Sequence, residues 1–381
     1  MAGSQYSPIN NSTDRVTSTQ KVTAGYFDGG VGTIGGTTNL VTASLSTTQK
    51  NYYYNLQYSS KDHFSVAYGH SGGSGSDYDE KTQNHFGETK AIYKYFADLL
   101  LDPVNRAEGD SIEEGYFFSQ SVNYNGGENV DGINDHIYVL SFERARMKDR
   151  VNKKNWTLQL SGSNVSLIGT AIGGTQATSS ILYLTDDSEY LEGVQTGAGI
   201  RYNIVSGSSG VQHTSASQAT YGWFYPDMGI MVFDANQLSA SLPGSASFVT
   251  AGAGSVASGN GLAPDLTNTG TADNAWKFAR AFMMGTQTFR NEEDQNTVSY
   301  FCRAFATQFN SSNNPSYTSG SQNRVRNLKF WGNPQTYITT VGLYSAAGGT
   351  AAPELVATGR LSSPVLKNNQ TEVTIKVNLT F

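Results

Sequence analysis

The sequence predicts a mainly β fold with a few short helices (α+β), arranged in several domains with antiparallel sheets and ending in a C-terminal β-sheet domain. The clearest observation is the segment 371–381, in which polar residues alternate with Val373, Ile375, Val377, Leu379 and Phe381. Strict alternation is typical of a strand with one buried face, so we expect Phe381 to lie in a core. The second observation is that charged residues make up only 15% of the chain, against about 25% in ordinary domains.

The composition also limits the classes of partner. The formal net charge of the 381 residues is −6, which argues against nucleic acid or an anionic membrane as the main partner. Aromatic residues reach 12%, and disordered chains are poor in aromatics, so we expect a folded chain. A surface that is short of charge but rich in Tyr, Asn and Ser is typical of one that neighbouring proteins cover.

The single cysteine and the N-terminal segment indicate the compartment. Cys302 cannot form an intrachain disulfide, and the apolar run around it predicts a buried core thiol. The N-terminal segment has no apolar signal core, and no stretch approaches the length needed to cross a membrane. We therefore expect synthesis in a reducing cytoplasm.

The chain divides into four expected parts. Residues 1–60 are polar and rich in glycine, which predicts an extended N-terminal arm. Residues 61–200 predict a β-rich domain with one helix, and residues 201–296 predict a region that contains a low-complexity Ala/Ser/Gly loop at 235–262. Residues 297–381 predict the C-terminal β domain.

Apolar spacing predicts the elements within these parts. A helix at 86–101 places Ile92, Phe96 and Leu99 at i, i+4 and i+7, and Pro103 ends it. A second, shorter helix is expected at 273–284. Short runs rich in β-branched and aromatic residues predict strands at 64–68, 137–142, 156–160, 181–184, 200–205, 230–233, 297–305, 337–344 and 354–361, in addition to the terminal strand.

Two short motifs resemble those of enzymes but lack the required context. Residues 69–73 (GHSGG) match G-x-S-x-G, but the nucleophile elbow needs a helix directly after Ser71, and Gly and Ser residues follow instead. Residues 30–35 (GVGTIG) match G-x-G-x-x-G, yet no helix pattern and no ribose-binding acid follow. Both are better explained as turns, so we expect no enzyme and no nucleotide cofactor.

Metal binding is not expected either. The five histidines are scattered, at positions 63, 70, 85, 136 and 213, and none pairs with another at metal-ligand spacing. The Asp/Asn/Gly-rich segment 128–135 fails the spacing of a calcium loop and is interpreted as a cluster of turns, with a loose oxygen-ligand site as the alternative. The acidic pairs at 186–187 and 292–294 are interpreted as solvated turns.

A basic run at 143–154 provides the candidate subunit contacts. Arg144, Arg146, Lys148 and Arg150 fall at even positions, so on a strand they would share one face. We expect that face to dock on an acidic surface of a neighbouring subunit. A solvated face is the simpler alternative, and nucleic acid contact is the weakest because no aromatic residues are interleaved.

Several segments together resemble a known family. They are residues 62–70 (DHFSVAYGH), 88–93 (ETKAIY), 137–148 (IYVLSFERARMK), 225–230 (YPDMGI), 337–344 (YITTVGLY), 357–364 (ATGRLSSP) and the ending 370–381. In this order they resemble the virion structural proteins of the tail and baseplate of T4-like contractile-tailed bacteriophages, those of cyanobacteria in particular. The ending is also similar to that of a T4-like baseplate wedge protein.

The resemblance implies a non-enzymatic structural component of a contractile phage tail, in the baseplate wedge. Such a protein would be made in the host cytoplasm and located in the virion. Its partners would be further copies of itself and other tail or baseplate proteins, with no nucleic acid and no membrane. Two alternatives remain open: a neck, head or fibre-attachment protein of the virion, or a carbohydrate-binding module that uses Tyr residues together with Trp223 and Trp331.

Overall fold

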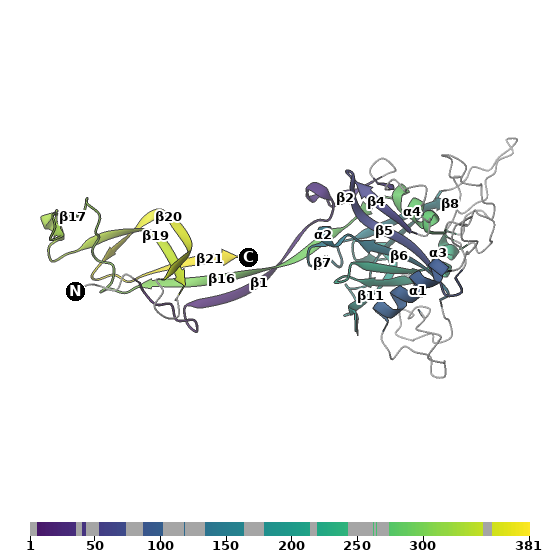
Figure 1. Ribbon diagram of the computed structural model, residues 1–381, viewed down its shortest axis with the longest axis horizontal. Helices are drawn as coiled ribbons and strands as arrows, with labels where there is room; N and C mark the ends of the chain where they lie inside the picture. The colour runs from purple at the N-terminus through teal and green to yellow at the C-terminus, as the bar shows by residue number, and fades with distance from the viewer. Residues whose placement is uncertain are drawn as a thin grey trace. The chain divides into compact units, whose positions relative to one another are not determined.

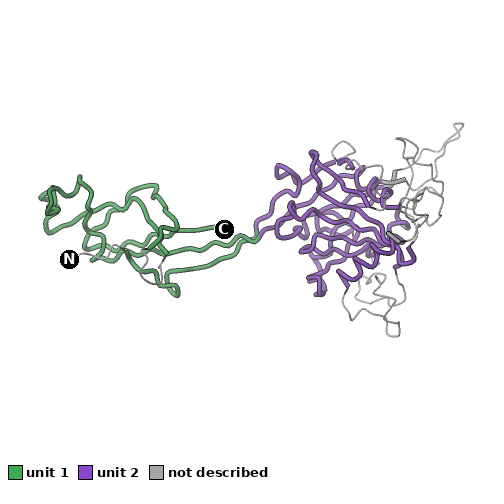
Figure 2. The backbone as a smooth tube through the Cα atoms, viewed as in Figure 1, with its two compact units in different colours: residues 1–21, 294–381 green, residues 22–293 purple. Residues whose placement is uncertain are grey.

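The computed structural model describes residues 6–35, 40–42, 53–73, 87–101, 118, 134–163, 179–213, 219–242, 262, 264, 274–345 and 353–381. The fold is mainly β, with 53% strand and 15% helix and large antiparallel sheets, which confirms the predicted fold class. Two compact units divide the chain (Figure 2). Unit 1 combines Met1–Lys21 with Asp294–Phe381, and unit 2 is Val22–Glu293. This division differs from the four consecutive parts expected, because the N-terminal residues belong with the C-terminal β region.

Unit 2 is built on one large sheet that curls on itself (Figure 1). Its hydrogen-bonded neighbours are antiparallel; for example, Phe64 lies opposite Phe142 and His70 opposite His136. Two short strands, β10 (Val194–Thr196) and β12 (Val211–Gln212), pair with β11 at the side of the main path. The main path runs β2 (Thr33–Ile34), β15 (Gln287–Thr288), β8 (Thr157–Ser163), β9 (Ser179–Asp186), β11 (Gly199–Ser208), β13 (Thr220–Tyr225), β14 (Ile230–Asp234), β6 (His136–Phe142), β5 (Lys61–His70), β4 (Tyr53–Tyr58) and β3 (Val41–Thr42).

Helices cover both faces of the middle of this sheet. On β6, Tyr138 and Leu140 pack in the cluster that contains α4 (Asn274–Met284) and α3 (Ala235–Ser241). Ile137 and Val139, on the opposite face of β6, pack in the cluster that contains α1 (Gly87–Leu100). A strand buried on both faces is apolar at every position, which explains the unbroken apolar run that predicted it.

The buried stripe of α1 differs from the expected one. The helix itself is confirmed, but Tyr93, Ala97 and Leu100 are buried, whereas Leu99 is exposed. The Tyr93 hydroxyl donates to the carbonyl oxygen of Asn134 at 2.7 Å and accepts from the amide of Phe118 at 3.0 Å. These hydrogen bonds satisfy the hydroxyl of a buried tyrosine, and the buried stripe lies one position further along the helix than expected.

Part of the expected N-terminal arm lies in the core of unit 2. Tyr26 and Phe27 are buried among the rings of Phe64, Phe142 and Phe289. The Tyr26 hydroxyl donates to the carbonyl oxygen of His63 and accepts from the amide of Glu143, and burial raises its pKa. These residues follow β1 (Arg15–Gly25) and precede the 3-10 turn η1 (Asp28–Gly30).

Unit 1 consists of thin antiparallel layers. One sheet runs β1, β16 (Arg290–Ala304) and β21 (Val373–Thr380), and the short β7 (Arg150–Val151) of unit 2 pairs with the first residues of β16. A separate hairpin joins β19 (Gln335–Ser345) to β20 (Glu354–Asn368). Short strands β17 (Thr318–Ser319) and β18 (Arg324–Val325) and the turn η3 (Leu328–Phe330) lie between β16 and β19.

The remaining sequence predictions have mixed outcomes. The terminal strand is confirmed, and residues 373–380 pair with residues 297–304 without a register shift. Its expected burial is wrong, because Phe381 is 74% exposed and the other apolar residues of β21 are half-buried. In the expected low-complexity loop, residues 235–241 form α3, and residues 243–261 lie outside the described residues. Within the described part of the chain, no helix is long and apolar enough to cross a membrane.

Candidate functional site

The four predicted subunit contacts do not share a strand face. Arg144 and Arg146 lie on a short helix, α2 (Arg144–Met147), and Lys148 follows it with a φ of +61°. Only Arg150 begins a strand. The alternation of charges therefore does not reflect a period of two, and the geometric part of the prediction is wrong.

Each of these cations also has a partner within unit 2. The guanidinium of Arg150 lies 3.0 Å from the buried carboxylate of Glu292. It also lies 3.2 Å from the carboxylate of Asp227, which is exposed. Glu292 lies in β16, so its assignment to a solvated turn is wrong. Because these cations are paired with groups of unit 2, their mutual repulsion is relieved without the acidic neighbouring subunit that the sequence analysis expected. The other pairs join Arg146 to Asp28, Lys148 to Glu293, and Arg144 to the carbonyl oxygens of Asp149 and Asp227.

The serine of the G-x-S-x-G motif lies in a polar cluster at the ends of β5 and β6. The Ser71 hydroxyl donates to the Asp135 carboxylate at 2.5 Å. His70 and His136 stack with ring centroids 4.4 Å apart, and burial lowers the pKa of His136 to about 4. In a serine hydrolase a histidine nitrogen receives the hydroxyl proton, whereas here the hydroxyl is bound to a carboxylate. The sequence did not indicate that these two histidines meet.

The G-x-G-x-x-G segment forms a turn and a strand. Residues 28–30 form η1, and β2 follows at 33–34 in place of the helix that a dinucleotide site requires. Within the described residues, no group of three His, Cys, Asp or Glu side chains has the geometry to hold a metal ion. Most of the Asp/Asn/Gly-rich segment 128–135 lies outside the described residues.

The acidic pair at 186–187 is buried, so its assignment to a solvated turn is also wrong. Asp186 accepts hydrogen bonds from the amides of Lys154 at 2.9 Å and Ser188 at 3.0 Å. Asp187 accepts from the backbone amide of Asn203 at 3.0 Å and from its side chain at 2.8 Å. Burial raises the pKa of Asp187 to about 6. The hydrogen bonds of Asp187 attach the turn after β9 to strand β11.

The raised pKa of Asp187 predicts a pH dependence of stability. The folded chain holds this proton up to about pH 6, whereas the unfolded chain releases it near pH 3.8. The favourable contribution is therefore fully present below pH 3.8 and is lost as the pH rises through 6, by roughly 2–3 kcal/mol. Relative to wild type, Asp187→Asn should gain that amount of unfolding free energy between pH 4 and pH 7. Urea unfolding measures it, with Glu192→Gln on the same turn as the control; a difference that stays constant with pH contradicts the assignment.

A small cavity lies beside α3. Its lining includes Phe118, Trp223 and Asp234, and its volume is about 20 Å³, which holds one water molecule. Asp234 caps α3 by accepting from the amides of Asn236 and Gln237. The cavity is too small for a substrate or a sugar.

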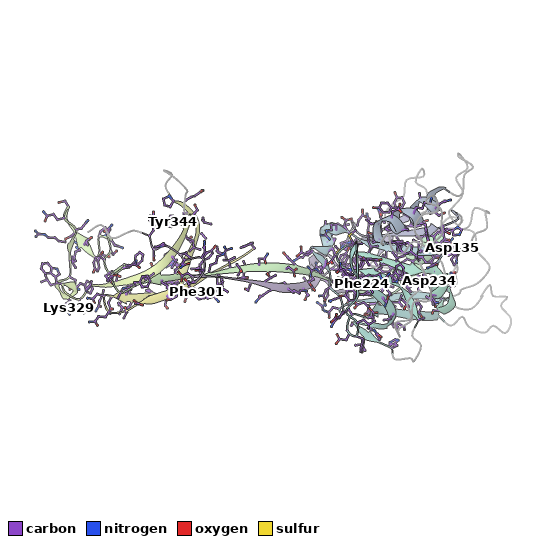
Figure 3. All side chains as sticks on the ribbon, turned by 90° about the horizontal axis from the view of Figure 1, so that it is seen from below. Asp135, Phe224, Asp234, Phe301, Lys329 and Tyr344 are labelled. Carbon is purple, nitrogen blue, oxygen red and sulfur yellow. The ribbon has the colours of Figure 1, made fainter. Side chains whose placement is uncertain are left out.

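The most unusual surface is in unit 1, which exposes far more large hydrophobic side chains than it buries. Among its described residues only Val298, Ala304 and Leu343 are buried hydrophobics, whereas twelve large hydrophobic side chains are exposed. The described residues of unit 2 include 47 buried hydrophobics and 13 exposed large ones. Figure 3 shows Phe224 of unit 2 within dense packing and Tyr344 of unit 1 on a thin layer of strands. Single exposed apolar residues are ordinary, but this balance is not that of an independent domain.

Two faces of unit 1 are apolar, and four of the twelve exposed side chains lie on the second of them. The first, here the terminal-strand face, consists of Val298, Tyr300, Cys302 and Ala304 of β16 and Val373, Ile375, Val377 and Leu379 of β21. Of these residues only Val298 and Ala304 are buried. Cys302 lies in the middle of the face and is half-buried, not the core thiol that was expected.

The second face, here the hairpin face, consists of two exposed cross-strand pairs. Tyr337 lies opposite Leu366, and Tyr344 lies opposite Leu355. Their side chains are between 41% and 64% exposed, which is unusual for aromatic and aliphatic pairs on a sheet. The terminal-strand face contains no charged residue, whereas on the hairpin the exposed Arg360 pairs with Thr340 between the two apolar pairs.

The two units also differ in charge, which the sequence analysis overlooked. Unit 1 holds nine Lys and Arg against four Asp and Glu, and unit 2 holds sixteen against 27. Between Asp294 and Glu354 no acidic residue occurs. Exposed cations in this segment lie beside Leu328 and Trp331, which are 75% and 66% exposed. The absence of acidic residues was the signal that could have directed attention to unit 1.

Comparison of the chain with protein-family models, with curated proteins and with solved structures finds no match. Among the described residues, the exposed apolar side chains of unit 1 are the most unusual feature of the surface.

Proposed function

We propose that this chain is a non-enzymatic structural subunit of a contractile phage tail, and that its place is in the baseplate wedge. The observation that carries the proposal is the apolar surface of unit 1, which needs a neighbouring protein to cover it. The order of the segments that resemble tail and baseplate proteins supports the same assignment.

The carbohydrate-binding alternative receives less support. Sugar-binding sites use exposed aromatic rings, but Trp223 is only 5% exposed and lies under the guanidinium of Arg201, 4.3 Å from its ring. Of the two tryptophans considered for this role, Trp331 alone is exposed. A place in the neck, head or fibre attachment shares the requirement for neighbours, and the experiment below separates it from the baseplate.

The test uses the phage that encodes the chain. We expect the protein in purified virions by mass spectrometry and at the baseplate by immunogold labelling. An amber mutation in its gene should leave filled heads without complete tails, and the chain supplied in trans should restore them. Labelling at the neck or head would move the protein within the virion, and its absence from purified particles would overturn the proposal.

A further inference from the structure

We propose that a lobe of unit 1 is a membrane-contact site, which inserts Leu328 and Trp331 into the headgroup region of an anionic bilayer. The lobe consists of residues 310–334 and contains β17, β18 and η3. Within unit 1, β17 lies at one end (Figure 1), and Lys329 lies at an end of the unit as well (Figure 3). The inference is independent of the proposed function, because it concerns a contact of the chain itself and not a position in a particle.

The apolar part of the site is a turn whose backbone is already hydrogen-bonded. The amide of Lys329 donates to the side chain of Asn327 at 3.0 Å. The amides of Phe330 and Trp331 donate to the carbonyl oxygens three positions earlier, at 3.0 and 3.1 Å. Polar backbone groups without partners are costly at the boundary of a bilayer, so this turn can enter the headgroup region at little cost. It presents Leu328 and Trp331 as two of the most exposed apolar side chains of the described residues.

Other residues of the lobe hold this turn in place. The ring of Phe330 stacks on that of Tyr317, with centroids 5.5 Å apart and planes 14° from parallel. The guanidinium of Arg326 donates to the carbonyl oxygen of Pro315 at 2.9 Å, and its amide donates to that of Tyr317 at the same distance. The inner side of the turn is therefore supported by Phe330, whereas Leu328 and Trp331 point away from this packing and are free to contact another surface.

The charge of the lobe selects an anionic surface. Arg324, Arg326 and Lys329 are all exposed, and the lobe has no acidic residue. The next acid along the chain, Glu354, lies opposite Ser345 near the far end of β19, roughly 30 Å from the lobe at the rise of a strand. Each Lys or Arg near an anionic membrane surface strengthens binding about fivefold. The chain's net charge of −6, which argued against a membrane, averages over two units whose charge balances differ in sign.

A bilayer fits these features better than an acidic protein or a nucleic acid does. Trp is enriched at the membrane–water interface, and Lys and Arg beside it keep their charges in the headgroup layer while their stems lie along apolar surface. An acidic protein would need a pocket for each of the two projecting side chains. A nucleic acid could stack on Trp331 but gains nothing from Leu328. Both residues lie outside the terminal-strand face and the hairpin face, which remain available to neighbouring proteins.

The experiment measures co-sedimentation of the purified full chain with vesicles, together with quenching of its tryptophan fluorescence by brominated lipid. We expect binding to mixed vesicles of phosphatidylserine and phosphatidylcholine, weakened by salt, and little binding to phosphatidylcholine alone. Quenching should report mainly Trp331, because Trp156 and Trp223 are buried. Leu328→Ser keeps this reporter and should weaken binding by roughly tenfold. Arg324→Gln combined with Lys329→Gln should weaken binding to the anionic vesicles by roughly tenfold or more.

A matched control removes exposed apolar side chains of unit 1 that lie outside the lobe. Tyr337→Thr and Val356→Thr replace residues that are each 64% exposed and should leave vesicle binding and quenching unchanged. Three results would overturn the inference: no binding to the anionic vesicles at low salt, binding that Leu328→Ser does not weaken, or adsorption without quenching. The last result, together with equal binding to polyglutamate, would assign the lobe to an acidic protein. None of these results bears on whether the protein is present in virions, so the two proposals fail separately.

Discussion

Replacing Trp156 by alanine is expected to lower the free energy of unfolding of unit 2 by about 3–5 kcal/mol. The side chain is fully buried, stacks on Phe289 with ring centroids 6.0 Å apart, and meets the ring of Phe224 edge-on at 5.3 Å. Alanine leaves a cavity that neighbouring rings cannot fill without losing their own contacts. Urea unfolding followed by far-ultraviolet circular dichroism measures the loss.

The matched control for Trp156 is phenylalanine. The indole N–H is buried and has no hydrogen-bond partner among the described residues. Trp156→Phe removes this unsatisfied donor together with part of the ring, so the two effects oppose each other and the cost should be well below that of alanine. Equal costs for the two variants would contradict the packing argument.

The elements that sequence predicts well are those decided by local pattern. The runs at 137–142 and 230–233 became β6 and β14, and the spacing at 86–101 became α1. Each contains a repeated apolar pattern long enough to specify its period without reference to the rest of the chain. The face of α1 that is buried was predicted less well, since it depends on partners for Tyr93 that come from 118 and 134.

Side-chain environments that depend on distant residues were not predictable. Asp187 and Glu292 are hydrophilic, and in a single sequence such residues are assigned to the surface. Asp187 is buried against Asn203, 16 residues further along the chain, and Glu292 against Arg150, which is 142 residues away. The basic run at 143–154 was misinterpreted for the same reason. Arg146 forms an ion pair with Asp28, which lies more than a hundred residues earlier in the chain.

For the terminal strand, the position was predicted correctly but the burial of its apolar residues was not. Alternation identified β21 correctly, but it reports only that one face is apolar and not what covers it. In the isolated chain that face is half-exposed, with Ile375 and Val377 at its centre. The sequence therefore predicted the apolar face correctly, but not that this face is only half-buried within the chain.

Lys367→Ala is expected to lower the stability of unit 1 by about 2–4 kcal/mol, because it removes a buried side chain together with the three hydrogen bonds of its ammonium. Lys367 is fully buried, and its ammonium donates to the carbonyl oxygen of Ala306 at 3.2 Å, the side chain of Asn310 at 2.8 Å and the carbonyl oxygen of Asn368 at 2.6 Å. Burial lowers the pKa of Lys367. Its hydrogen bonds to Ala306 and Asn310 attach the turn after β16 to strand β20.

Lys367→Met separates this polar role from the volume of the side chain. In a unit with an ordinary core, methionine would restore stability by filling the space. Here it removes the same three hydrogen bonds, so we expect it to be nearly as destabilising as alanine, while Lys376→Ala on the exposed face of β21 should change little. Thermal unfolding of the full chain measures both, and a methionine variant as stable as wild type would show that unit 1 is organised by volume and not by this polar contact.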